Sequence, residues 1–138
     1  MRFVLDASVS LGWFLDHPVT SYASRVRQLL ASGSRAVVPA LWHLEMANGF
    51  AGAERRAILS AADADLCLAQ VEQLLGRAIE SETELVTVRQ ACTTARTFGL
   101  SSYDAVYLEM ASRAGLALAT LDQPLRSAAH RAGVEILR

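Results

Sequence analysis

The sequence contains no lysine, and all 13 of its basic residues are arginines, set against 14 acidic residues. The formal net charge is therefore −1, so no basic excess points to nucleic acid, although a local patch can bind phosphate without one. The missing lysine also excludes two site types that depend on it. A P-loop requires Gly-Lys-Ser or Gly-Lys-Thr, and a response-regulator receiver requires a lysine in its site.

Cysteine and long hydrophobic runs are equally scarce. Cys67 and Cys92 do not form a Cys-x-x-Cys pair, and no histidine stands at ligand spacing from either. We interpret them as buried thiols of a reducing compartment, which predicts a cytoplasmic protein. No run of about eighteen uncharged apolar residues exists, so no membrane span is expected. Asp6 interrupts the apolar N-terminal stretch and no small-residue cleavage site follows, so no export signal is expected.

Hydrophobic residues make up 52% of the 138 residues, which is enough for the core of one domain spanning 1–138. Helical patterns occupy 21–31, 60–76 and 101–114. Strands alternating with helices predict a three-layer α/β fold, with a mainly parallel sheet of about five strands and helices on both faces. Short, almost continuous apolar runs predict the strands, which would be buried on both sides, at 3–5, 36–38, 85–88, 116–119 and 134–137.

Four acidic residues are expected at one edge of this sheet. Asp6 and Asp122 each follow a predicted strand, and ligands of parallel sheets bind at the carboxyl ends of the strands. Asp104 lies in the first turn of its helix, on one stripe with apolar Leu108. Glu45 follows the second strand on a helix. The sequence therefore predicts that four carboxylates converge.

Each acid also has an ordinary structural explanation. Asp6 and Asp122 could cap the following segments, Asp104 could favour its helix dipole, and Glu45 could pair with an arginine. Together, however, close carboxylates repel by roughly 4 kcal/mol per pair at an effective dielectric near 20, so a cation is required. Oxygen ligands without nearby histidine or cysteine favour Mg²⁺ or Mn²⁺. The remaining acids are interpreted as solvated, among them Asp63, Asp65, Glu72, Glu80, Glu82 and Glu84.

Several segments together carry a family resemblance: FVLDASVSLGWF, PALWHLEMANGF, LSSYDAVYLEMASRAGLALATLD and GVEIL. In this order they resemble the PIN-domain ribonucleases, specifically the VapC-type toxins of bacterial toxin–antitoxin pairs, over nearly the whole chain. The resemblance implies a PIN-like domain in which four acids bind metal, with three supporting residues beside them. The acids are Asp6, Glu45, Asp104 and Asp122, and the supporting residues are Ser8, Asn48 and Thr120.

The same resemblance implies an activity and partners. The expected activity is hydrolysis of RNA with Mg²⁺ or Mn²⁺, leaving a 5′-phosphate and a 3′-hydroxyl. The expected partners are a small cognate antitoxin, which lies in an apolar groove and blocks the site, and a second copy of the chain in a homodimer. Four arginines are candidate phosphate contacts, with an ordinary solvated surface as the alternative: Arg25, Arg27, Arg55 and Arg56.

Three other functions compete with this interpretation. A haloacid-dehalogenase-type phosphatase requires Asp-x-Asp after the first strand, where this chain has Asp6-Ala7-Ser8. A nuclease acting on DNA flaps generally carries additional helices, for which this chain is short. A catalytically weak PIN-like module that only binds RNA or protein is the main alternative, which the complete set of acids disfavours.

Overall fold

A computed structural model describes residues 1–138 and has a four-stranded sheet in which every strand is parallel to its neighbours. The order across the sheet is β3-β2-β1-β4. The predicted strand at 134–137 contributes only an isolated bridge between Leu118 and Ile136, so the sheet has four strands rather than about five. The strands are β1 (Arg2–Leu5), β2 (Arg35–Val38), β3 (Ile79–Ser81) and β4 (Ala117–Ala119).

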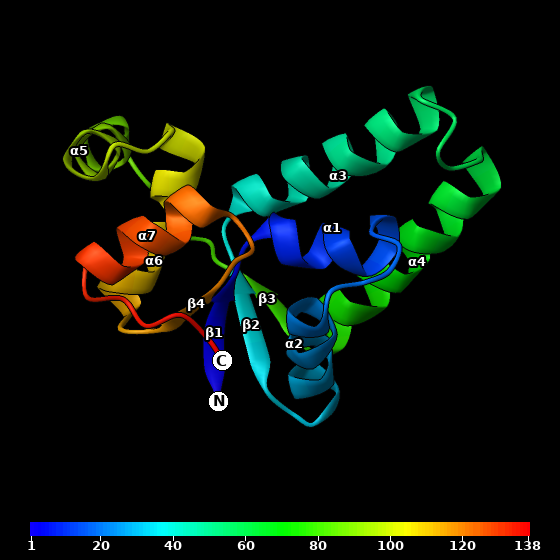
Figure 1. Ribbon diagram of the computed structural model, residues 1–138, viewed down its shortest axis with the longest axis horizontal. Helices are drawn as coiled ribbons and strands as arrows, with labels where there is room; N and C mark the ends of the chain where they lie inside the picture. The colour runs from blue at the N-terminus through cyan, green and yellow to red at the C-terminus, as the bar shows by residue number, and fades with distance from the viewer.

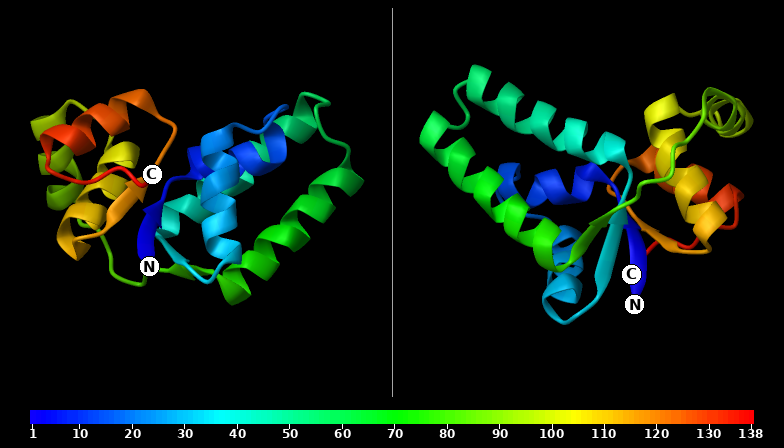
Figure 2. Two further views of the ribbon diagram at one scale, coloured as in Figure 1. Left: turned by 60° about the horizontal axis from the view of Figure 1, so that its bottom comes forward. Right: turned by 180° about the vertical axis from the view of Figure 1, so that it is seen from behind.

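Seven helices enclose the sheet, which confirms the α/β prediction. Figures 1 and 2 show α1 to α4 on one side of the central strands and α5 to α7 on the other. Their bounds are α1 (Ala7–Leu15), α2 (Ser21–Ala31), α3 (Ala40–Arg55), α4 (Ala61–Arg77), α5 (Val88–Phe98), α6 (Ser102–Ala114) and α7 (Gln123–Arg131).

The strand order creates a switch point beside β1. The chain passes from β1 to β2 and β3 in one direction, and then returns to place β4 on the other side of β1. In open parallel sheets the ligand crevice forms outside the carboxyl ends of the strands at such a point. The segments that follow β1 and β4 therefore flank the expected crevice.

Buried contacts fix the helices around this point. Phe3, Val4 and Leu5 are fully buried, because β1 is covered on both faces. The indole Nε1–H of Trp42 donates to Ser10 Oγ at 2.9 Å, which ties the start of α3 to α1. Further along α3, Gly49 lies so close to α1 that a Cβ at this position would clash with the side chain of Leu11. The two helices that follow β1 and β2 are thus held close together.

The predicted strand at 85–88 is wrong. The third strand is β3, and residues 82–87 form a linker that leads into α5. Thr87 and Gln90 form a capping box, in which each backbone N–H donates to the other side chain, at 2.9 and 3.2 Å. These local bonds start a helix at Val88. Leu85 is 81% exposed, so the apolar run that suggested a strand lies on the surface.

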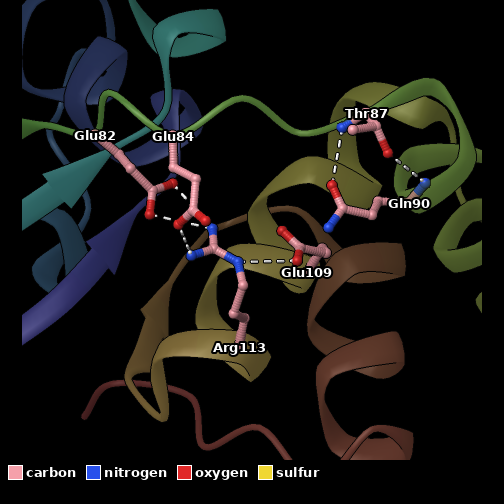
Figure 3. Close-up of polar contacts among 6 residues, drawn as sticks. All are labelled: Glu82, Glu84, Thr87, Gln90, Glu109 and Arg113. Carbon is pink, nitrogen blue, oxygen red and sulfur yellow. Dashed lines mark hydrogen bonds and ion pairs between the residues drawn. The ribbon is translucent and has the colours of Figure 1, made fainter.

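Arg113 of α6 anchors this linker (Figure 3). Its guanidinium donates to Glu84 at 2.7 Å, to Glu82 at 3.1 Å and to Glu109 at 3.0 Å. Glu80 pairs with Arg2 at 3.1 Å on the opposite edge. Glu80 and Glu84 keep exposed side chains, as the sequence predicts, whereas the side chain of Glu82 is only 17% exposed. The ion pairs of Glu82 and Glu84 with Arg113 connect the 82–87 linker to α6.

Two further predictions concern cysteine and membranes. Cys67 is partly buried and Cys92 is exposed, so the prediction of buried thiols is wrong for Cys92. Both cysteines are free. None of the helices combines the length and the apolar character needed to cross a bilayer.

Candidate functional site

Asp6 lies at the end of β1, beside the switch point. Its side chain is almost completely buried, with 4% of the residue exposed. Oδ2 accepts hydrogen bonds from the hydroxyls of Ser8, at 2.6 Å, and Thr120, at 2.7 Å. Asp6 occupies the N-cap position of α1 but makes no side-chain capping bond. Capping therefore does not explain this carboxylate, which is instead oriented by two hydroxyls.

The same hydroxyls connect the turns that follow β1 and β4. The backbone N–H of Leu121 donates to Ser8 Oγ, and that of Asp122 donates to Thr120 Oγ1, both at 3.0 Å. Each hydroxyl thus accepts one bond and donates one to Asp6. The structure therefore brings Ser8 and Thr120 to Asp6, at the edge where the sequence places them.

Glu45 reaches the site from the first half of α3. Its Oε1 accepts a hydrogen bond of 2.6 Å from the hydroxyl of Tyr107, which is fully buried in α6. Sequence reasoning did not assign Tyr107, although it lies three residues after Asp104 on the same buried stripe. Asn48, in contrast, is exposed and its side chain makes no hydrogen bond to the acids, so the structure does not join it to them.

Asp122 and Asp104 stand at the starts of α7 and α6. Asp122 Oδ2 accepts from the N–H of Leu125 at 3.0 Å, so the alternative explanation of a helix cap does hold for this acid. Asp104 lies in the first turn of α6, where Ser101 provides the cap. The Asp104 carboxylate is therefore not needed for capping.

Burial and neighbouring negative charge raise the pKa values of Asp104, Asp6 and Glu45. Burial raises the pKa of Asp104 from 3.8 to about 6, with further increases from the charges of Asp122, Asp6 and Glu45. Burial also raises the pKa of Asp6, against the lowering by its hydrogen bonds from Ser8 and Thr120. The pKa of Glu45 is raised by burial and by the charge of Asp6, and lowered by Tyr107. The metal-free site is an electrostatically strained anionic cluster.

The donor chemistry suits a hard cation, since the site contains only carboxylate and hydroxyl oxygens. No three His, Cys, Asp or Glu side chains are positioned here as a ready metal cage. Hydrogen bonds hold Asp6, Glu45 and Asp122 to protein partners. These bonds fall on Oδ2 of Asp6, Oε1 of Glu45 and Oδ2 of Asp122.

Comparison with known proteins assigns the family, because the PIN-domain profile matches residues 3–131. The chain belongs to the PIN-domain family. PIN domains are generally nucleases acting on nucleic acids. The matched range contains all four acids together with Ser8 and Thr120. No curated protein sequence matches this chain.

Three solved structures have a similar fold. PAE2754 from Pyrobaculum aerophilum shares 20% identity at a TM-score of 0.67, covering 93% of this chain and 84% of the other. FitAcB from Neisseria gonorrhoeae shares 21% identity at a TM-score of 0.67, and the match covers 100% of this chain and 97% of the other. VapBC2 from Rickettsia felis, in a structure bound to a DNA fragment from the VapBC2 promoter, shares 13% identity at a TM-score of 0.59. The match covers 88% of each chain. At these identities the likeness establishes the fold.

Proposed function

We propose that this PIN-domain protein is a Mg²⁺- or Mn²⁺-dependent endoribonuclease and the toxin of a VapBC-type toxin–antitoxin module. The observation that carries the proposal is the coupled cluster of four acids at the β1/β4 switch point. Burial and the charges of the other three acids raise the pKa of Asp104, which supports their placement around one site. A fold retains such repulsion where a cation or a reaction uses it.

In this proposal Asp6, Glu45, Asp104 and Asp122 hold the metal. When bound, a divalent ion supplies an activated water and neutralises the charge that develops on the phosphate. The chain's own residues prepare the ligands. Ser8 and Thr120 fix Asp6 in one orientation, and Tyr107 does the same for Glu45. Such outer partners orient metal ligands and sustain the affinity of the site.

The direct test is cleavage by the purified protein, freed of any bound partner. It is expected to cut structured RNA in Mg²⁺ or Mn²⁺ and to stop when EDTA removes the ion, because the carboxylates alone offer no activated nucleophile. Gel analysis of end-labelled RNA measures both, and mapping the ends tests for a 5′-phosphate and a 3′-hydroxyl. Cleavage that persists in excess chelator contradicts the metal mechanism.

The alternative is a catalytically weak module that binds RNA or protein through the same fold. It predicts metal binding, seen as a thermal shift, without cleavage of any RNA. Measuring metal binding and RNA cleavage on one preparation therefore distinguishes the enzyme from the binding module. The hydrogen-bonded support of Asp6 favours the enzyme, because precise orientation matters for turnover more than for simple charge attraction.

The proposal includes two protein partners, supported by the fold similarity to VapBC2 and FitAcB. One is a small antitoxin that covers the acids. The other is a second copy of the chain, for which the surface of α5 and α6 is suited. Val88 and Tyr103 are 88% and 62% exposed there, beside an apolar cavity of about 530 Å³. Free cysteines, one of them exposed, fit action in the reducing cytoplasm.

Light scattering on the protein alone and with the product of a neighbouring small gene tests these partners. The expected masses are those of two chains, and of two chains with bound antitoxin, and the complex should no longer cleave RNA. A protein that remains a single chain contradicts the homodimer. A chain that is harmless when expressed alone and binds no product of a neighbouring gene contradicts the toxin assignment.

A further inference from the structure

A cavity of about 610 Å³ lies between α2, α7 and the C-terminal segment, outside the carboxylate cluster. Arg25 of α2, Arg126 of α7 and Arg138 bring three guanidinium groups to its wall, together with His130. Figure 2 (left) shows the segment that follows α7 running toward α2. Residues from two distant parts of the sequence thus form one basic surface, in a protein whose net charge is −1.

None of the three arginines forms an ion pair with a carboxylate side chain. Elsewhere in the molecule, carboxylates pair with arginines: Arg2 and Arg35 contact Glu80, and Arg113 contacts three glutamates. Glu135 lines the cavity, yet it forms no ion pair with the arginines around it. Planar guanidinium groups without a carboxylate partner suit phosphate oxygens, which they bind in a bidentate manner.

Tyr22 connects this basic surface to the acid cluster. The guanidinium carbons of Arg126 and Arg25 lie 4.8 and 5.9 Å from the centre of its ring. Its hydroxyl is buried without a hydrogen-bond partner, close to Arg126 and to the backbone of Thr120. Thr120 in turn donates to Asp6 at 2.7 Å. The arginines therefore begin directly behind the residues that orient the catalytic carboxylate.

The course of α7 sets the direction away from the site. Asp122 caps the helix, and His130 lies eight residues further on, or roughly 12 Å along the axis at 1.5 Å per residue. A strand whose phosphate meets the carboxylates can continue along α7 and place a later phosphate between α2 and α7.

We propose that Arg25 and Arg126, with Arg138, form a phosphate subsite that binds the backbone of the substrate strand beyond the cleaved bond. This inference rests on the proposed nuclease function and names how its substrate is held. The ligand is a phosphodiester of single-stranded RNA, recognised by charge and geometry without regard to base.

The test is the binding of a fluorescent dodecanucleotide RNA to the full chain in EDTA, where no cleavage occurs. The double variant Arg25→Gln with Arg126→Gln should bind the dodecanucleotide about tenfold more weakly. The slope of log K against log salt concentration should become shallower by about 1.4, at about 0.7 per lost phosphate contact. Arg25→Lys with Arg126→Lys keeps the charge and should retain the salt slope.

The matched control is Arg77→Gln with Arg89→Gln, which removes two exposed arginines that make no ion pair. If the Arg25 and Arg126 variant binds the dodecanucleotide as tightly as this control, the subsite is wrong, even where the protein cleaves RNA. Binding of inorganic phosphate that is lost in the variant, with RNA affinity unchanged, assigns the cavity to a free anion and also overturns it. If the Arg25 and Arg126 variant loses RNA binding and the unmodified protein never cleaves RNA, the result supports the phosphate subsite and contradicts the proposed nuclease function.

Discussion

Asp6→Asn and Asp104→Asn are each expected to lower RNA cleavage by more than 10²-fold. Loss of an outer partner of a metal ligand already costs about 10–100-fold, and these substitutions change proposed ligands themselves. Asn is nearly isosteric with Asp, so packing is preserved and the loss is electrostatic. Initial rates in Mg²⁺ and Mn²⁺ measure the effect, with the exposed Asp65→Asn as a matched control that should cleave normally.

The melting temperatures of the same variants distinguish a metal site from a purely structural role of these carboxylates, such as helix capping. Without metal, each should melt at the same temperature as the unmodified protein or higher, because removing one charge relieves the repulsion in the cluster. The stabilisation given by millimolar Mg²⁺ or Mn²⁺ should shrink, since a ligand that binds only the native state stabilises it by RT ln(1 + [L]/Kd). Differential scanning fluorimetry measures both quantities.

Asp122→Ala provides the contrast within the same cluster. Its carboxylate caps α7 through the N–H of Leu125, so its loss should destabilise the metal-free protein by about 1 kcal/mol. Asp6 and Asp104 make no such bond. If Asp6→Asn and Asp104→Asn also melt lower, and the metal-induced shift stays as in the unmodified protein, the four-carboxylate site is wrong.

The second large effect is a loss of metal-free stability as the pH rises through about 6. Asp104 has a pKa of about 6 in the folded protein against 3.8 as the reference value. A raised folded pKa means that the folded state binds the proton more tightly. Its stabilising contribution is complete below pH 3.8 and is lost as the pH passes through about 6. Asp6 and Glu45, whose pKa values are also raised by burial, add effects of the same sign.

The size of this effect follows from the shift. A shift from 3.8 to about 6 corresponds to about 3 kcal/mol, but Asp104 is partly exposed and solvent screening reduces this to roughly 1–2 kcal/mol. Urea unfolding at a series of pH values in EDTA measures it. Asp104→Asn should flatten the profile between the two pKa values, whereas Asp65→Asn should not. A profile that is the same with Asp104→Asn contradicts the coupled cluster.

The sequence placed part of the candidate site because the signals for it are local. Asp6 ends an apolar run and Asp122 follows another, so their places at the carboxyl edge depend only on recognising strands. Helical periodicity likewise placed α2 at 21–31, as the structure has it. The strand at 85–88 failed because apolar residues do not by themselves show burial. Capping bonds between Thr87 and Gln90 decided for a helix there.

Contacts between residues that are distant in the sequence could not be predicted from local sequence patterns. Tyr107 donates to Glu45 across 62 positions, and Thr120 donates to Asp6 across 114. The basic cavity joins Arg25 to Arg126 over a similar distance in the chain. No periodicity encodes such pairs, because they depend on how the helices pack against the sheet.

The sequence by itself determined that the chain forms a parallel α/β sheet and that four acids either follow its strands or lie in the first half of its helices. Alternation of strands and helices, and the residues that end them, are consequences of local burial and capping. Only the tertiary structure decided which hydrogen bonds hold each acid and that their charges raise the pKa of Asp104. Those properties arise from distances and desolvation, which exist only after β4 has returned beside β1 and closed the site.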